Sequence, residues 1–377
     1  MTSVRVEGVK IIGLVNAIPD RIRTWEDDAK QFGVEEMQRV VKNTGVSKRS
    51  VADHLCTSDL CHAAAERLFE KLGWAKDSID VVVMVTQTPD YPSPATACLL
   101  QNRLGLPVTV AAFDVNLGCS GYTYGLWIAA SLMAAGKLKR CLLLAGDVVS
   151  RAASPMDRAV VPLFGDAGSA TALELSPDAP PMVFEMGTNG AGGMFLHTLA
   201  GAAKHPITAV DLIAGERKDG ITRSNQHTYM NGAEVLTFAM VAVPPMIEAL
   251  RTAVGWTAAD VDYYVFHQAS RFMLKNIGRI LRIPGTSQQL VIGLEGYGNT
   301  SSASIPMAIN DQLMELTTTK RKLVLAGFGI GWSWCAVAID LDPIMLTEMV
   351  RVPDEPHPGD FEHLKDHEFV TPPVLPG

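Results

Sequence analysis

The feature that most constrains the fold is an internal duplication with a period of about 180 residues. In the first copy, residues 57–74 have the apolar spacing of a helix and residues 79–85 read as a buried strand. The same order returns at 234–256 and 261–267. Three pairs of matching positions, each 182 residues apart, are Gly73 and Gly255, Trp74 and Trp256, and Asp80 and Asp262. The register predicts two similar halves related by pseudo-symmetry.

The repeat continues through a second helix and strand in each half. Gly118-Cys119 corresponds to Gly298-Asn299, and each pair begins a stretch of small residues with helical character. The strand CLLLAG at 141–146 then corresponds to KLVLAG at 322–327. Alternating helices and buried strands predict an α/β fold with helices packed on sheets. Pro244-Pro245 is expected to kink or divide the helix of the second copy.

Changes in composition along the chain suggest where the halves end. The string SPDAPP at 176–181 marks the seam, which gives an N-terminal half over 1–175 and a C-terminal half over 176–341. Residues 342–377 are dense in proline and charge without a sustained period, so we expect an irregular tail there.

Charge and cysteine usage exclude several classes of protein. A net charge of -8, from 32 Lys+Arg against 40 Asp+Glu, argues against a general nucleic-acid binder. The six cysteines are scattered, and the first residues lack a long apolar core before a small-residue site, so a reducing cytoplasm is expected. No apolar run approaches the roughly 20 residues that span a bilayer, so no membrane span is expected.

Cys119 is the first candidate for chemistry. Residues 111–147 predict a strand that ends at Gly118-Cys119 and a helix that begins there. A helix N-terminus stabilises an anion, so we expect a lowered pKa and a nucleophilic thiolate. An inert buried cysteine explains the local pattern equally well.

His267 and Asn299 favour the catalytic interpretation. His267 stands where the strand of VFHQAS runs out, and strand ends are where α/β folds place their chemistry. The duplication brings Asn299 opposite Cys119. Separately, these could be a structural histidine and a turn residue. Together, a nucleophilic thiol, a histidine for proton handling and an amide that donates to an oxyanion form a set for acyl transfer.

Up to about residue 341 the chain resembles the ketoacyl synthase III family of the thiolase superfamily. The matching strings are TGVSKRSVA (44–52), FDVNLGCSGYTYGL (113–126), DRAVVPLFGDAGSA (157–170), MNGAEV (230–235), HQAS (267–270), GNTSSASIP (298–306) and GFGIG (327–331). The resemblance implies a thiolase fold, in which duplicated halves with mixed sheets form layers in the order α-β-α-β-α.

The resemblance also implies a reaction. Cys119 would take an acyl group from acyl-coenzyme A or an acyl carrier protein, and His267 and Asn299 would bind the thioester oxygen of malonyl-acyl carrier protein during its decarboxylation. The Cys119 N–H and an amide of the GFGIG loop would form the acyl oxyanion hole, with Phe328 and Gly329 shaping the site. No metal or organic cofactor is required. A homodimer is implied, in which Tyr91 would reach the acyl pocket of the neighbouring subunit.

Several positions depart from the family pattern. Arg39 and Asn43 stand where the family commonly has a tryptophan and an arginine that hold the adenine of coenzyme A. Ser270 replaces an asparagine of HQAN, and Ile330 replaces a glycine of the GFGGG loop. These differences suggest a specialised relative with its own acyl donor or pocket.

Basic residues after His267 suggest a partner surface. They are Arg271, Lys275, Arg279 and Arg282, whose helical spacing would form one positive face. An acidic carrier protein could dock there, although a solvated helix face has the same appearance.

Two other functions stay open at this point. One is transfer of the acyl group to an alcohol or amine with His267 as general base, and the other is a non-catalytic partner subunit. A degradative thiolase is disfavoured because Cys335 lies within an apparent strand rather than in a catalytic loop.

Overall fold

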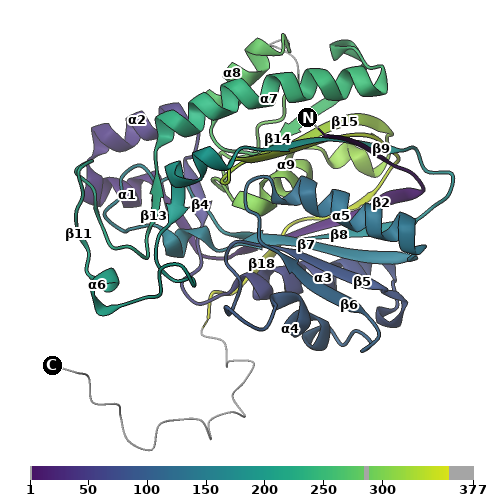
Figure 1. The fold of residues 1–377 in the computed structure, drawn as a ribbon, viewed down its shortest axis with the longest axis horizontal. Coiled ribbons are helices and arrows are strands. Elements are labelled where there is room, and N and C mark those ends of the chain that lie inside the picture. The colour runs from purple at the N-terminus through teal and green to yellow at the C-terminus, as the bar shows by residue number, and fades with distance from the viewer. Residues whose placement is uncertain (1, 284–287, 356–377) are drawn as a thin grey trace, which may run out of the picture.

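The computed structural model describes residues 2–283 and 288–355 of the 377-residue chain. Two mixed sheets lie one above the other with helices outside and between them (Figure 1). From one side to the other, the helices are α7 (Gly232–Val254) and α8 (Arg271–Ile280), then α5 (Gly121–Gly136) and α9 (Ser304–Gln312), then α3 (Thr57–Leu72) and α4 (Thr96–Arg103). The predicted layered α-β-α-β-α fold is therefore confirmed.

The first sheet contains most strands of the N-terminal half. Its strands are, in spatial order, β17 (Met345–Leu346), β2 (Val9–Pro19), β8 (Ala167–Leu175), β7 (Arg140–Asp147), β5 (Val81–Val85) and β6 (Ala111–Val115), with β18 (Val350–Val352) also on β2. Strand β5 runs parallel to β6 and β7, whereas β8 is antiparallel to β7 and β2. Because β5, β6 and β7 are parallel, the carboxyl end of β6, which precedes Cys119, meets the ends of its neighbours at one edge.

The second sheet repeats this plan. Its strands are, in spatial order, β1 (Thr2–Val6), β9 (Met182–Thr188), β16 (Ser333–Leu341), β15 (Arg321–Gly329) and β14 (Tyr263–Phe266). Strands β14 and β15 are parallel, and β15, β16, β9 and β1 pair antiparallel in turn. The parallel pair ends beside His267, as the first sheet's parallel strands end beside Cys119.

The predicted register of the duplication is confirmed by matching contacts in the two halves. Asp80 accepts the Arg140 N–H at 3.0 Å, and Asp262 accepts the Lys322 N–H at 2.7 Å. The cation of each of these basic residues lies over the tryptophan of its own half, Trp74 at 4.6 Å and Trp256 at 5.2 Å. Each aspartate therefore fixes the start of a parallel strand, β7 in the first half and β15 in the second, through the same kind of backbone hydrogen bond.

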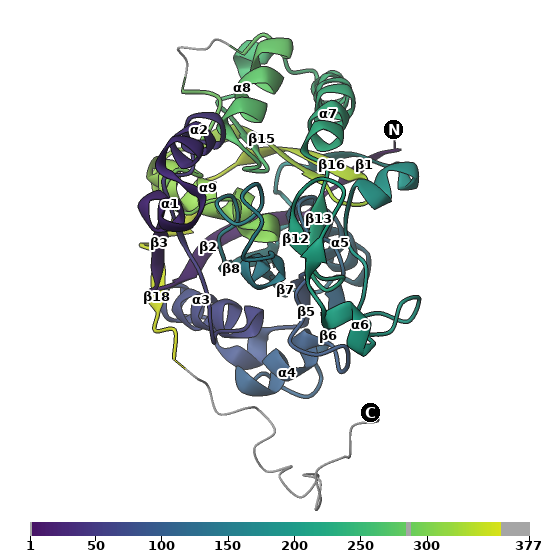
Figure 2. The same cartoon turned by 90° about the vertical axis from the view of Figure 1, so that its left-hand side faces the viewer.

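The layers are seen from another side in Figure 2, and three large apolar clusters hold them together. The central cluster joins α5 and α9 to the inner faces of both sheets, with Tyr122, Val265 and Ile309 among its buried members. Helix α7 covers the outer face of the second sheet and α3 that of the first. The two sheets enclose α5 and α9, and this packing holds the N-terminal ends of the two helices close to each other.

Helix α7 differs from expectation in two respects. It runs unbroken through Pro244 and Pro245, so the division expected there is wrong. A proline has no N–H, so the carbonyl groups one turn before Pro244 and Pro245 lose their helical donors. Val241, in that turn, is 70% exposed, so water can reach this part of the backbone. Within the described residues α7 is also long and apolar enough to cross a membrane, so length does not exclude a span. One face of α7 packs on the second sheet, and 33% of its most apolar stretch is buried there.

The start of the predicted tail is ordered structure. Strands β17 and β18 pair parallel with β2, and the Asp354 carboxylate accepts the N–H groups of Asp53, His54 and Leu55 at 2.7–3.1 Å. Residues 342–355 are therefore irregular only in part, because the open edge of β2 provides hydrogen-bond partners for two short strands, and the residues between them have no regular structure. Residues 356–377 of the predicted tail lie outside the described residues.

Smaller elements surround the site. Four short strands and one short helix lie between β9 and α7, where the strands form two antiparallel pairs, and the other small elements belong to the N-terminal region. They are β3 (Ile22–Thr24), α1 (Trp25–Phe32), α2 (Val34–Thr44), β4 (Lys48–Ser50), β10 (Leu196–Thr198), α6 (Ala209–Leu212), β11 (Gly215–Glu216), β12 (Thr222–Arg223) and β13 (Thr228–Met230). Helix α2 ends beside the cavity described below.

A buried ion pair holds α1 against this region. Asp28 is fully buried, and its carboxylate accepts from Arg49 at 2.7 and 3.0 Å and contacts Arg23 at 2.7 Å. Arg49 is itself only 2% exposed. The pair joins α1 to β4, and thereby fixes α2 at the cavity entrance.

We expect Arg49→Met to lower the free energy of unfolding by about 3 kcal/mol, because it leaves the Asp28 charge buried with one cation fewer. Denaturant unfolding followed by circular dichroism measures this loss. The control is Arg5→Ala, which breaks the exposed Arg5–Glu7 pair and should cost less than about 0.5 kcal/mol. Equal losses for the two variants would contradict the role given to the buried pair.

Candidate active site

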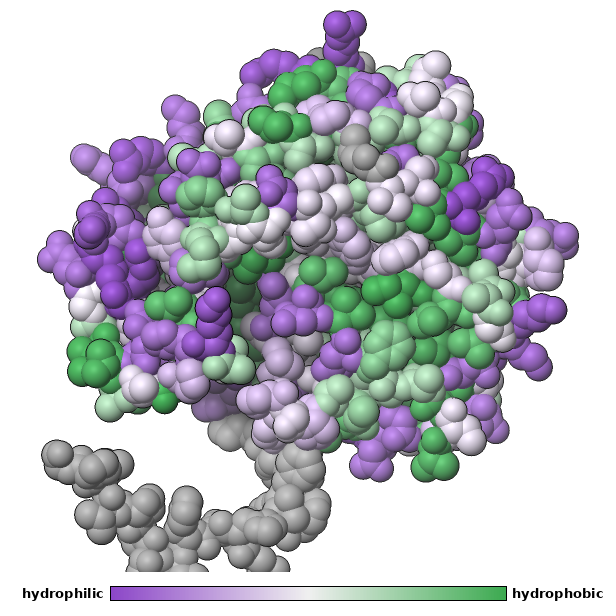
Figure 3. All heavy atoms as spheres, viewed as in Figure 1, coloured by the Kyte–Doolittle hydropathy of each residue, from purple (hydrophilic) through white to green (hydrophobic). Residues whose placement is uncertain are grey.

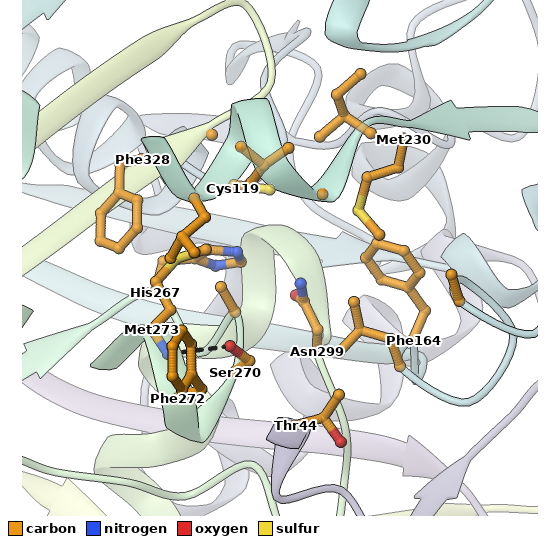
Figure 4. A pocket seen from close by; sticks show the side chains of 18 of the residues that line it. Thr44, Cys119, Phe164, Met230, His267, Ser270, Phe272, Met273, Asn299 and Phe328 are labelled. Atoms are coloured by element: carbon orange, nitrogen blue, oxygen red, sulfur yellow. Dashed lines mark hydrogen bonds between the residues drawn. The ribbon is translucent and has the colours of Figure 1, made fainter. Parts of the chain in front are cut away.

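Cys119, His267 and Asn299 line one cavity of about 500 Å³ between the two halves. Figure 4 shows them converging from three segments: the turn before α5, the end of β14 and the loop before the short helix η5 (Ser301–Ala303). The rest of the wall is mainly apolar, with Leu163, Phe164, Leu196, Met230, Val235, Leu236, Phe238, Phe272, Met273 and Phe328. The structure therefore brings together the three residues that the sequence selected.

Cys119 lies just before the first turn of α5, whose N-cap is Ser120. The residue borders the cavity, but its sulfur is enclosed, and this burial raises the pKa of the thiol to about 11. Hydrogen bonds from the backbone of Ile330 and of Cys119 itself oppose the rise, while the Asp147 charge adds to it. The expected lowering of this pKa is wrong, because desolvation outweighs the helix terminus.

The backbone approaches the sulfur closely at the GFGIG loop. A Cβ atom on Gly329 would lie 2.8 Å from the Cys119 sulfur, so only glycine leaves room there. This approach brings the Ile330 N–H to the sulfur, beside the N–H of Cys119. The family comparison had suggested an amide from this loop, and the one that faces the thiol belongs to Ile330.

His267 is buried and uncharged at neutral pH. Burial lowers the pKa of His267 to about 3, and a hydrogen bond to the Ser301 backbone opposes the shift. Its Nδ1 lies 2.7 Å from the Ser304 hydroxyl, and its ring meets Phe328 edge-on with centroids 5.8 Å apart. These contacts fix the plane of the ring.

Asn299 is held by a tight turn. Gly298 has a φ of +73°, and a Cβ there would lie 2.8 Å from the Leu163 carbonyl oxygen. The Asn299 N–H donates to that oxygen at 2.9 Å, and the Asn299 side-chain Oδ1 accepts the Ser301 N–H at 2.9 Å. Because the carboxamide oxygen is occupied, its NH₂ group is the end available to a ligand (Figure 4).

Ser301 and Ser304 are functional neighbours that the sequence reasoning missed. The Ser301 N–H donates to the Asn299 side chain, and Ser301 opposes the effect of burial on two pKa values, that of His267 through its backbone and that of Cys119 through its hydroxyl. Both serines belong to the string GNTSSASIP. In that string only Asn299 was predicted to be functional, because residues that merely orient other side chains follow no recognisable spacing in a sequence.

The remaining predicted site residues are distributed differently. Phe328 and Gly329 line the cavity, as expected. Tyr91 is not in the described lining of its own chain's cavity, and its predicted place is the pocket of a neighbouring subunit. Asn43 and Ser270 also line the cavity, but Arg39 pairs with Glu36 on α2. Ser270 is the N-cap of α8 and accepts the Met273 N–H at 3.2 Å, a capping role that asparagine fills equally well. The change from asparagine therefore preserves the helix start.

The four basic residues do not form a single helical face. Arg271 is paired with Glu295 at 2.9 Å, and Lys275 and Arg279 are exposed on α8. Helix α8 ends at Ile280, and Arg282 follows it with a φ of +56°, so its expected place on the helix is wrong. Two exposed cations, Lys275 and Arg279, thus remain on a helix whose start borders the cavity.

Comparisons with known proteins identify a family that the chain resembles. Family descriptions of 3-oxoacyl-[acyl-carrier-protein (ACP)] synthase III and of its C-terminal part match residues 113–190 and 251–341. A beta-ketoacyl-[acyl-carrier-protein] synthase III of Rhodopirellula baltica is 31% identical, over 87% of this chain and 97% of its own. One of Synechocystis is 33% identical, with the same coverage.

A solved structure extends the likeness to the fold. A 3-oxoacyl-(acyl-carrier protein) synthase from Burkholderia xenovorans LB400 superposes with a TM-score of 0.87 at 36% identity. The match covers 93% of this chain and 99% of that one.

Alkylation should report the raised pKa of Cys119. A rise from 9.0 to about 11 lowers the thiolate fraction at pH 8 about 100-fold relative to an ordinary thiol. We expect iodoacetamide to modify Cys119 at a rate that increases about tenfold per pH unit up to about pH 10. Peptide mass spectrometry measures the rate, with the exposed Cys98 as internal reference. A rate that levels off below pH 9 would contradict the assignment.

Proposed function

The chain belongs to the 3-oxoacyl-[acyl-carrier-protein] synthase III family of acyltransferases, and from this premise we propose that it condenses a Cys119-bound acyl group with a malonyl thioester. The proposal rests on one observation: two separate sets of hydrogen-bond donors face the same cavity. The amides of Cys119 and Ile330 face the sulfur, and the Asn299 NH₂ group and His267 lie across from it. Two donor sets suit a reaction with two oxyanions.

In the first half-reaction the Cys119 sulfur attacks the carbonyl of an acyl thioester. A carbon–sulfur bond forms, and the carbonyl oxygen becomes an oxyanion that the amides of Cys119 and Ile330 can bind. The bond to the carrier sulfur then breaks, and the proton of the Cys119 thiol ends on the released carrier thiol. Because the resting thiol is neutral, its proton must be transferred as the bond forms.

In the second half-reaction a malonyl thioester loses carbon dioxide and becomes an enolate. Its oxygen would accept hydrogen bonds from the Asn299 amide and from His267. Donation from His267 to the enolate requires the tautomer with its proton on Nε2, in which Nδ1 accepts the Ser304 hydroxyl. The enolate carbon then attacks the acyl-cysteine carbonyl, a carbon–carbon bond forms, and Cys119 leaves as a thiolate that is reprotonated.

The proposed substrates are an acyl-coenzyme A or acyl-carrier-protein donor and malonyl-acyl carrier protein as extender. No metal or organic cofactor takes part in the scheme. An acidic carrier protein would approach Lys275 and Arg279 of α8, whose first residues border the cavity. The mainly apolar wall suits the acyl and pantetheine portions of such substrates.

We also propose that the protein is a cytoplasmic homodimer. Strand β6 is the edge of the first sheet, and its residues Phe113 and Val115 are only partly buried. On α5, Leu132 is 40% exposed, and Tyr124 and Trp127 are also partly buried. An apolar area lies over α5 and β6 in Figure 3. A second copy could cover this area and pair with the strand edge. The free cysteines agree with a reducing compartment.

Two variants separate the half-reactions. Cys119→Ala should give no acyl adduct by intact-protein mass spectrometry after incubation with coenzyme A and carrier-protein donors. Asn299→Ala should acylate like the wild type, but release of labelled carbon dioxide from malonyl-acyl carrier protein should fall about 10²- to 10³-fold, as for loss of an oxyanion donor. Asn102→Ala, on the exposed side of α4, is the matched control.

The wild-type result decides between the functions. An adduct with labelled carbon dioxide supports condensation, and the donor that loads identifies the starter class. An adduct without decarboxylation would favour acyl transfer to an alcohol or amine. No adduct from any donor would favour a non-catalytic partner subunit.

The dimer proposal has its own test. The wild type should sediment as a dimer, and Trp127→Glu should sediment as a monomer, because it places a charge in the proposed apolar interface. Val241→Glu, an equivalent change at the exposed side chain on α7, should leave the dimer intact. A wild type that is monomeric at micromolar concentration would refute the interface.

A further inference from the structure

The loop that carries Asn299 is fixed from outside at three points. The Asn299 N–H donates to the Leu163 carbonyl at 2.9 Å, and the Asn299 carbonyl accepts the Gly165 N–H at 3.2 Å. Past Asn299, the Ser302 N–H donates to the Asp147 carboxylate at 3.0 Å. The first two contacts hold the start of the loop, and Asp147 holds its end.

Ser301, between these anchors, acts on all three proposed catalytic residues. Its N–H donates to the Asn299 side chain at 2.9 Å. Its hydroxyl lowers the pKa of Cys119 against the effect of burial, and its backbone raises that of His267. Its φ is +50°, a left-handed conformation that a residue with a Cβ adopts only at a cost. The contacts on both sides of Ser301 must therefore hold it there.

Asp147 is well placed to do this. It ends strand β7 in the first half, and only 1% of its surface is exposed. One carboxylate oxygen accepts the Gln87 N–H at 2.7 Å and the hydroxyls of Thr86 and Thr88 at 3.0 and 3.3 Å. The other accepts the Ser302 N–H. The carboxylate thus joins the strand ends of the first half to the Asn299 loop of the second.

We propose that Asp147 is a positioning residue for the second half-reaction, which holds Ser301, and through it Asn299 and His267, in register with Cys119. This inference rests on the proposed condensation and assigns a residue to its decarboxylating step. Both carboxylate oxygens are needed as acceptors. An amide in the same place would accept on one side only, so its NH₂ group would oppose either the Ser302 N–H or the Gln87 N–H and disturb the joint between them.

The contact has opposite consequences for the two half-reactions. The negative charge of Asp147 contributes to the raised pKa of Cys119 and so works against formation of the thiolate. Its geometry, in contrast, serves Asn299 and His267, which bind the enolate. A group that merely stabilises the fold would affect both half-reactions in the same direction.

The test is Asp147→Asn, with the two half-reactions measured separately. Alkylation and acylation of Cys119 should be retained, with their pH profiles moved to lower pH because a negative charge is removed. Carbon dioxide release from malonyl-acyl carrier protein, counted per acylated enzyme, should fall about 100-fold, as expected for a displaced catalytic group. Dividing the rate of carbon dioxide release by the amount of acylated enzyme restricts the comparison to folded active sites.

A matched control removes a different donor from the same carboxylate. Thr86→Val deletes a hydroxyl bond to Asp147 and leaves the Ser302 bond intact, so its decarboxylation per acylated enzyme should stay close to that of the wild type. If Asp147→Asn does not fold, Asp147→Ser is the second variant, and the same selective loss is expected.

Two results would overturn the inference. One is an Asp147→Asn enzyme that decarboxylates at the wild-type rate per acylated site. The other is a fall of acylation and decarboxylation by the same factor, which would indicate a general structural role. A wild type that acylates without decarboxylating malonyl-acyl carrier protein would instead contradict the proposed function, and the alkylation profile of Asp147→Asn would still report whether its charge acts on Cys119.

Discussion

The geometry of the site depends on how closely strand β15 approaches the turn that carries Cys119. A Cβ on Gly327 would lie 2.8 Å from Cα of Ser120, and one on Gly329 would meet the Cys119 sulfur. Backbone without side chains at both positions lets the two halves meet at van der Waals distance. The amide of Ile330 consequently reaches the sulfur, and His267 and Asn299 come to face it across the cavity. Any wider seam would separate the residues of one half from those of the other.

The groups that face the proposed reaction are electrically neutral at rest. The thiol keeps its proton, the imidazole lacks its second proton, and the third group is a carboxamide. In an apolar cavity, a negative charge that develops on substrate oxygen would meet preorganised dipoles rather than compete with resident ions. This arrangement favours transition states that gain charge over ground states that already carry it.

The duplication and the layered fold could be predicted because helix and strand patterns recur in the sequence at a fixed interval. Cys119 and Asn299 stand at matching positions of the two copies, and His267 stands at the end of a predicted strand. Asp80 and Asp262 even make the same bond in the two halves. The pKa of Cys119 could not be predicted, because it depends on how fully the sulfur is enclosed and not on the helix start alone. Ser301, Ser304 and Asp147 were missed for a related reason. Asp147 and Ser302 are 155 residues apart and belong to no repeat, so only the packing of the halves reveals their contact.

The strand pairing also determines when the fold can be completed during synthesis. Strand β1 has no pairing partner until β9 has been synthesised. One edge of β2 stays unpaired until residues 345–352 have been synthesised. Helix α5, which emerges early, is covered on its second side only after β15 and β16 exist. A nascent chain therefore carries an uncovered apolar helix through most of its translation. Long-range pairing of this kind folds slowly and leaves a partly made chain dependent on protection from aggregation.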